Sequence, residues 1–187
     1  MRLLEDLKKY KPYNEREEKD KEIIIHCLEN EPNIFTRDNK LVHMTASAWL
    51  TNKDHTKILM AYHNIYKSFS WLGGHCDGND NCLEVAIEEI KEESGIKNVK
   101  PISENIFSIE VLTVDGHIKK GEYVSSHIHL NVTYLLEADD SEELKVKEDE
   151  NSAVKWFLKD DAVNASNEPW FRENVYSKLN KKMEEFL

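Results

Sequence analysis

The chain has 187 residues and a mass of 21.9 kDa, which suits one domain with a hydrophobic core and a short added segment but not two full domains. Asp and Glu number 36 against 25 Lys and Arg, and the formal charge of −11 argues against non-specific nucleic-acid binding and against charge-driven docking on an anionic membrane. Because 40% of the residues are apolar and Gly and Pro are few, the composition also excludes a disordered or fibrous chain.

No stretch of the sequence reaches the roughly 18 to 20 apolar residues that a membrane-spanning helix needs. The three cysteines, Cys27, Cys76 and Cys82, are odd in number and form no C-x-x-C pair, so neither a disulfide framework nor a thiolate zinc site is predicted. These features predict a cytoplasmic protein that is neither exported nor membrane-bound.

Residues 1–38 are predicted to form a helical N-terminal extension. An apolar stripe over residues 3–10 predicts a first helix, Pro12 interrupts the pattern, and a second helix is expected over residues 14–29 with Asn14 as its N-cap. The sequence is compatible with three roles for this extension: covering the sheet, shaping a substrate pocket, or mediating a homodimer.

Residues 39–187 are predicted to form a single α/β domain, because the apolar period changes from helical to alternating near residue 40. The expected strands are 41–51 and 57–62, joined as a hairpin, then 69–72, 106–114, 123–136 and 153–158; the expected helices are 83–94, ended by Gly95, and 170–186. A helix between strands, with another after the last strand, is typical of a mixed α/β sandwich.

The predicted helix 83–94 carries three carboxylates on one face, beside its apolar stripe: Glu89, Glu92 and Glu93. Grouped anions repel one another unless a cation lies between them, and hard divalent cations prefer carboxylate oxygens. An ordinary solvated acidic face is the alternative. The preceding strand ends in Gly73 and Gly74, which allow the backbone to approach a metal or a phosphate closely.

From Gly74 to Ile96 the sequence resembles the box of the Nudix hydrolase family, G-x5-E-x7-R-E-U-x-E-E-x-G-U, where U is aliphatic. Every spacing is kept. Two positions depart from the pattern, because Asp80 stands where the family has Glu and Glu88 stands where it has Arg. In the family this Glu and this Arg are taken to form a salt bridge that braces the helix against the loop, and here both positions are acidic.

The resemblance implies an α/β/α sandwich with a mixed sheet, and hydrolysis of a nucleoside diphosphate linked to another group, with Mg²⁺ or Mn²⁺ and without an organic cofactor. It implies metal ligation by the Glu92 and Glu93 carboxylates and the Gly74 carbonyl, with Glu89 as a further ligand or the general base. A further family Glu precedes a late strand that bears Trp, and Glu150 occupies that place as a second catalytic candidate, with Glu148 and Asp149 as rivals.

Three points stay open in the sequence. A catalytically weak Nudix-fold module that binds a nucleotide is the alternative function, and Glu88 in place of Arg keeps it open. His127 and His129 alternate with Asn131 on one face of a predicted strand, so they are candidates for substrate contact or for plain packing under a loop. An EF-hand-like spacing from Asp77 to Glu88 fails because position 6 of that loop, Cys82, is not the glycine that its turn requires.

Overall fold

The computed structural model describes all residues except 1, 120 and 150. Its centre is a mixed eight-stranded sheet in which the main strand order is β10-β2-β1-β9-β5, while β3 pairs with β2, β4 with β1 and β6 with β9. The strands are β1 (Val42–Asn52), β2 (Lys57–His63), β3 (Ser68–Ser70), β4 (Leu72–His75), β5 (Val99–Pro101), β6 (Ser108–Val114), β9 (His127–Ala138) and β10 (Asn151–Leu158).

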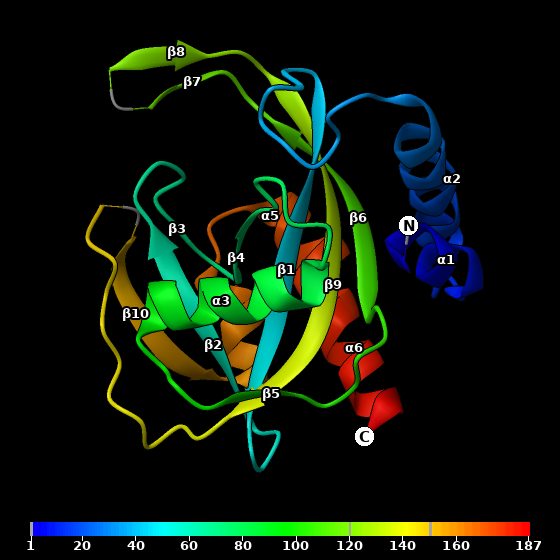
Figure 1. The fold of residues 1–187 in the computed structure, drawn as a ribbon. Helices are drawn as coiled ribbons and strands as arrows, with labels where there is room; N and C mark the ends of the chain where they lie inside the picture. The colour runs from blue at the N-terminus through cyan, green and yellow to red at the C-terminus, as the bar shows by residue number, and fades with distance from the viewer. Residues whose placement is uncertain (1, 120, 150) are drawn as a thin grey trace.

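Helices cover both faces of this sheet (Figure 1). Helix α3 (Cys82–Ser94) crosses the front face, and α4 (Lys159–Ala165), α5 (Pro169–Phe171), a π-helical turn (Arg172–Tyr176) and α6 (Ser177–Phe186) lie behind it. The N-terminal helices α1 (Arg2–Lys9) and α2 (Glu15–Asn30) lie beside β6. The arrangement is the α/β/α sandwich with a mixed sheet that the sequence predicted.

Strand β1 is the middle of the fold, and all of its residues are buried. It pairs in parallel with β9 along its whole length and antiparallel with β4, whose Gly74 lies opposite Ala46. Because side chains alternate along a strand, Met44 and Ala46 face the core under α3, whereas Trp49 faces the second core under α6. The two faces of one strand therefore serve two separate cores.

The N-terminal helices contribute to the core on the α3 side, through Leu3, Leu7, Ile24 and Leu28. Helix α2 begins where predicted, because the Asn14 side chain accepts a hydrogen bond from the Glu17 backbone N–H. Near the C-terminal end of the box, Gly95 ends α3 in the left-handed conformation with φ of 74°, as its position in the sequence predicted.

Several elements were not predicted. They are the short strand β5, the helix α4, and a separate two-stranded sheet of β7 (His117–Lys119) and β8 (Glu122–Val124). The predicted closing helix consists of α5, a π-helical turn and α6 in direct succession, and the Ser177 N–H donates to the Arg172 carbonyl oxygen, five residues earlier, as in a π-helix. Lys120, the second residue of a basic pair in the sequence, lies outside the described residues.

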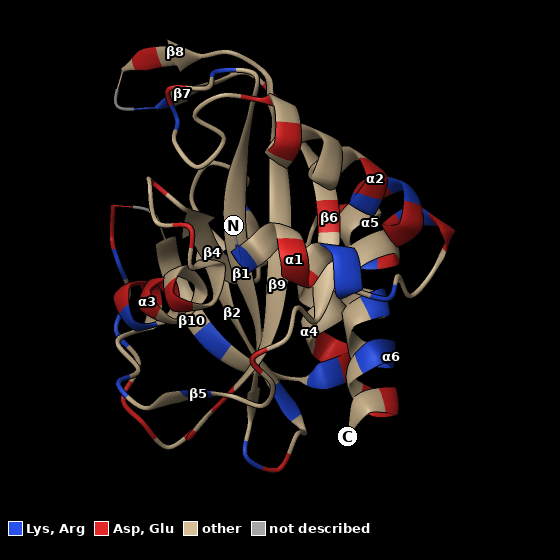
Figure 2. Ribbon diagram, turned by 45° about the vertical axis from the view of Figure 1, so that its right-hand side comes forward, with Lys and Arg blue, Asp and Glu red and all other residues tan. Residues whose placement is uncertain are grey.

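Charge is distributed unevenly over these elements. Figure 2 shows Asp and Glu concentrated on α3, whereas Lys and Arg are prominent on α6. Within the described part of the chain, no helix is both long enough and apolar enough to cross a membrane.

Candidate active site

The loop between β4 and α3 is fixed at both ends by hydrogen bonds. Asn79 Oδ1 accepts from the Asn81 N–H at 2.9 Å, and Asn81 in turn caps α3 by accepting from the Glu84 N–H. The Arg37 guanidinium donates to both oxygens of Asp77, at 2.8 and 2.7 Å, which ties this loop to the segment before β1. The loop is therefore held by its own asparagines and by an arginine that precedes β1 in the sequence.

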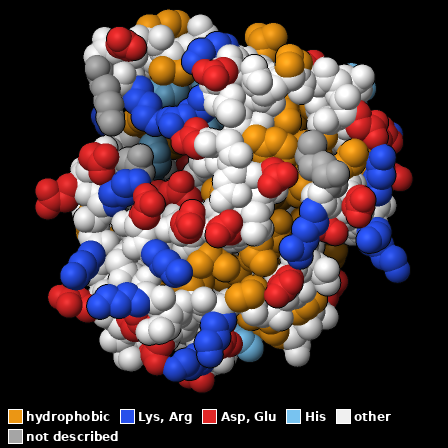
Figure 3. Space-filling view, in the orientation of Figure 1, with side chains coloured by type: hydrophobic (Ala, Val, Ile, Leu, Met, Phe, Trp, Pro, Cys, Tyr) orange, Lys and Arg blue, Asp and Glu red, His pale blue; other side chains and the backbone are white. Residues whose placement is uncertain are grey.

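The carboxylates of α3 lie against the end of β4. A Cβ atom at Gly74 would overlap the Glu89 carboxylate, so only glycine leaves room for this approach of strand and helix. Glu93 is buried, Glu89 is half-buried, and Glu92 is exposed with its Oε2 atom 3.3 Å from Lys147 Nζ. Figure 3 shows acidic side chains gathered on this front face.

This set of donors fits a hard divalent cation. The Glu89 carboxylate lies against the backbone of Gly74, Glu92 and Glu93 stand three and four residues further along the same helix, and carboxylate and carbonyl oxygens are the ligands that Mg²⁺ and Mn²⁺ prefer. Glu150 lies outside the described residues, so its predicted role stays a prediction. Glu88 and Asp80, the two departures from the family box, are both exposed.

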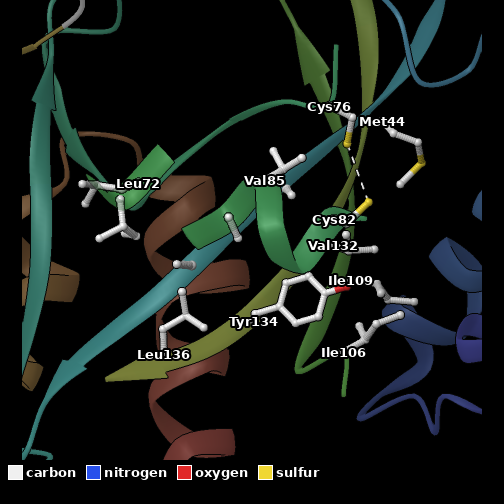
Figure 4. Close-up of a cluster of buried hydrophobic side chains, with 14 of the residues drawn as sticks. Met44, Leu72, Cys76, Cys82, Val85, Ile106, Ile109, Val132, Tyr134 and Leu136 are labelled. Carbon is white, nitrogen blue, oxygen red and sulfur yellow. Dashed lines mark hydrogen bonds between the residues drawn. The ribbon is translucent and has the colours of Figure 1, made fainter. Parts of the chain in front are cut away.

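Two thiols join the loop to the helix. The sulfurs of Cys76 and Cys82, which flank the loop, are 3.6 Å apart, and both side chains are buried near Met44 and Val85 (Figure 4). The contact with Cys76 is the largest cause that raises the pKa of the Cys82 thiol, and burial is the second. Both cysteines are unbridged, so the junction is a packed pair of free cysteines.

His127 and His129 share one sheet face with Asn131, as predicted, and this face is the one turned away from α3. Two histidines that the sequence analysis did not connect with them, His43 on β1 and His75 on β4, lie beside them. The ring centroids of His43 and His129 are 5.0 Å apart, and those of His75 and His129 are 4.9 Å apart. Strand pairing brings these four side chains together from three places in the sequence.

Further along the same face lies a buried ion cluster, which we define as Glu17, Glu110, Lys178 and Lys182. Lys178 Nζ lies 2.9 Å from Glu17 Oε1 and 3.0 Å from Glu110 Oε1, and Lys182 Nζ lies 3.0 Å from Glu17 Oε1. Two anions and two cations balance, which compensates for the cost of removing each from water.

Hydrogen bonds extend the ion cluster into the sheet. Glu110 Oε2 accepts from Asn131 Nδ2 and from Thr133 Oγ1, both at 2.9 Å, and Asn131 Oδ1 accepts from the Thr45 and Ser47 hydroxyls. A continuous polar network therefore joins α2, the sheet and α6 behind the box. The sequence analysis missed it, because Glu17 has the position of an ordinary first-turn acid on a helix and nothing local marks its lysine partners.

Comparison with known protein families gives a match over most of the chain. The family model described as "NUDIX domain" matches residues 41–179, which is most of the chain. The chain belongs to the NUDIX family. Family membership makes it a Nudix-type pyrophosphohydrolase, as the box predicted.

Solved structures agree with this NUDIX assignment at the level of the fold. A NUDIX-family hydrolase from Clostridium perfringens matches with 24% identity and a TM-score of 0.53 over 78% of this chain and 98% of its own. The MutT protein from Methanosarcina mazei Go1 matches with 14% identity and a TM-score of 0.56, covering 75% and 94% of the two chains. An Ap4A hydrolase from C. elegans matches with 17% identity and a TM-score of 0.52, covering 76% and 96%. A search of curated proteins gave no significant match.

Proposed function

We propose that this NUDIX protein hydrolyses a phosphoanhydride bond in a nucleoside diphosphate linked to another group, with Mg²⁺ or Mn²⁺ bound at the box. The observation that supports this most directly is the approach of Gly74 to the Glu89 carboxylate, because it brings the backbone of β4 and a carboxylate of α3 to one place. A bound divalent ion would neutralise charge on the phosphate oxygens and lower the pKa of the attacking water.

Each residue of the proposed site has its own role. Glu92 and Glu93 supply anionic ligands, Glu89 acts as a ligand or as the general base, and the Gly74 carbonyl completes the set. Glu92 would exchange its contact with Lys147 for the metal, since that contact is on the surface and costs little to break. Glu150 remains a second candidate for proton transfer.

The two glycines of β4 allow a sharp test of this site. The atoms nearest to a Cβ at position 74 belong to the carboxyl group of Glu89, the flexible end of that side chain, whereas a Cβ at position 73 comes within 2.5 Å of the Ala46 carbonyl oxygen and 2.6 Å of the Ser47 Cα. Gly74→Ala should therefore displace the carboxylate and reduce metal-dependent turnover while thermal stability changes little. Gly73→Ala should instead lower the melting temperature, because backbone must move. If Gly74→Ala keeps full turnover, the proposed site is wrong.

Substrate choice is tested by product release. The purified chain is incubated with dinucleoside polyphosphates, nucleotide sugars and nucleoside triphosphates, with and without Mg²⁺, and phosphate, AMP and other nucleotides are measured. We expect metal-dependent release from at least one class. Tight nucleotide binding without release from any class would favour the alternative, a nucleotide-binding module with weak catalysis, for which Glu88 in place of Arg is the specific reason.

We further propose a cytoplasmic location and a small-molecule nucleotide as the partner, with neither nucleic acid nor membrane bound and a homodimer as one possible assembly. The exposed acidic face of α3 and the net charge of −11 support the absence of a polyanionic partner. Light scattering at two protein concentrations measures the oligomeric state.

A further inference from the structure

The histidine cluster, which we define as His43, His75, His127 and His129, is produced by strand register. His43 on β1 is the parallel partner of His129 on β9, and His75 on β4 is the antiparallel partner of Thr45, two residues beyond His43. Residues two apart on a strand share a face, so all four imidazoles lie on the side of the sheet away from α3. One ring nitrogen from each of His43, His75 and His129 lies within 4.8 Å of the other two.

The hydrogen bonds of the cluster fix which nitrogens carry protons. His43 Nδ1 lies 3.0 Å from the Asn39 carbonyl oxygen, and His127 Nδ1 lies 2.8 Å from the Ser125 carbonyl oxygen. A carbonyl only accepts, so we assign the proton of each neutral ring to Nδ1, which leaves a lone pair on each Nε2. Backbone carbonyls that hold the distal N–H in this way are the usual outer partners of metal-binding histidines.

The buried ring of His43 lacks one hydrogen bond within the described part of the chain. It is 4% exposed, and its Nε2 atom is buried with no hydrogen-bond partner among the described residues. A buried polar atom without a partner costs free energy, and a metal ion that accepts the lone pair removes that cost. This is an observation independent of the spacing of the rings, and it points to a ligand.

The protonation state of the cluster is also suitable. Burial, together with the neighbouring histidines, lowers the pKa of His129 to about 2. Burial also lowers the pKa of His43. The rings of His43 and His129 are thus neutral near pH 7, which is the form that binds metals.

The rings whose nitrogens all lie within 4.8 Å of one another are those of His43, His75 and His129, and His127 adjoins this set through His129. The Nε2 atoms of His127 and His129 are 3.1 Å apart, close to the roughly 3.3 Å that separates two nitrogens on a tetrahedral zinc with bonds of about 2.0–2.1 Å. Without metal, the contact is satisfied when His129 Nε2–H donates to the lone pair of His127 Nε2. A metal ion would replace that hydrogen bond with two ligand bonds.

We propose that the histidine cluster binds one borderline transition-metal ion, with Zn²⁺ as the representative, at a site separate from the carboxylates of α3. Imidazole nitrogens favour Zn²⁺ and its first-row neighbours, whereas the carboxylates of α3 favour Mg²⁺ and Mn²⁺, so the two donor sets select different metals. The site would fasten β4, in which His75 directly follows Gly74, to β1 and β9. Metal binding at the histidine cluster does not depend on the proposed hydrolysis.

The test is a titration of the chelator-treated full chain with Co²⁺, followed by displacement with Zn²⁺. We expect one Co²⁺ per chain, with the strong visible absorption of a four-coordinate ion that persists in excess Mg²⁺. His129→Asn should weaken binding at least ~100-fold, since loss of even outer partners of a metal site costs ~10–100-fold. His26→Asn, at an exposed histidine of α2, is the matched control and should bind as the parent does.

Variants of the box separate this proposal from the proposed function. Glu92→Gln and Glu93→Gln should keep the four-coordinate Co²⁺ spectrum whatever they do to turnover. A weak, six-coordinate spectrum that survives His129→Asn, or one lost in Glu92→Gln, would overturn the proposal.

A second measurement needs no variant at all, which matters if His129→Asn does not fold. In the ¹⁵N-labelled parent chain, Zn²⁺ should shift the Nε2 resonance of His43 while its Nδ1 stays protonated against Asn39. An unshifted Nε2 resonance would equally overturn the proposal.

Discussion

Neutralising Glu17 in the buried ion cluster should destabilise the whole fold. The Glu17 side chain is fully buried, where desolvation alone would raise its pKa, yet the attraction of Lys178 and Lys182 outweighs this and lowers the pKa from 4.5 to about 2. A carboxyl pKa lowered from 4.5 to about 2 corresponds to about 3 kcal/mol of folding free energy at pH 7. Breaking a buried ion pair from one side costs about 3–5 kcal/mol, which agrees.

The assay is urea unfolding of Glu17→Gln, followed by fluorescence. We expect an unchanged slope and a free energy of unfolding about 3–5 kcal/mol below that of the parent. Glu18→Gln, at the exposed neighbour on α2, is the control and should change stability by less than about 0.5 kcal/mol. If Glu17→Gln unfolds within about 1 kcal/mol of Glu18→Gln, the ion cluster does not stabilise the fold as argued.

The pH dependence gives an independent check with a definite sign. Because the folded-state pKa of Glu17 is depressed, its contribution is fully present above the unfolded value of 4.5 and is lost as the pH falls toward about 2. The stability difference between the parent and Glu17→Gln should therefore be constant from pH 7 to about 5 and shrink below that. A difference that grows as the pH falls would contradict the assignment.

Three further predictions concern the box and its surroundings. Glu92→Gln and Glu93→Gln should each lower metal-dependent turnover at least ~100-fold with an intact circular-dichroism spectrum, and more than a tenth of parental turnover at saturating Mg²⁺ would show that the site is misplaced. Glu88→Gln should change turnover less than about fivefold because this side chain is exposed, and Glu88→Arg should keep or raise it by pairing with Asp80; a loss beyond ~30-fold in Glu88→Gln would instead make Glu88 a ligand or base. Mobility-shift assays with duplex DNA at physiological salt should show no binding, because the net charge is −11, and micromolar binding without divalent metal would contradict this.

The parts of the fold that follow from local signals were predictable. Helix α3 was expected over residues 83–94 and runs from Cys82 to Ser94. The prediction was accurate because the apolar period and the terminating Gly95 both lie within one short segment. Asn14 was recognisable as a cap for the same reason. The spacing of the box placed Gly74 and Glu89 in one site, and their backbone-to-carboxylate contact agrees with that placement.

The features that depend on strand register were not predictable from one sequence. The histidine cluster exists because β1 pairs in parallel with β9, which aligns His43 with His129 across nearly half the chain. Sequence reasoning found the alternation of His127 and His129 but had no means of placing His43 and His75 beside them. Glu17 and Lys178 likewise show no local sign of pairing, since each stands on a helix that also carries exposed charges.

The long span of the buried ion cluster has a consequence for how the protein is made. Glu17 and Lys182 are separated by 165 residues, and β9, the parallel partner of β1, is itself a late element. During synthesis from the N-terminus, β1 and the box helix are complete well before the strand that they need, and Glu17 has no cation until α6 emerges. Contacts of such long sequence separation fold slowly. The nascent chain should therefore hold an unfinished sheet through most of translation, and the ribosome-bound chain should gain protease resistance only after α6 has left the exit tunnel.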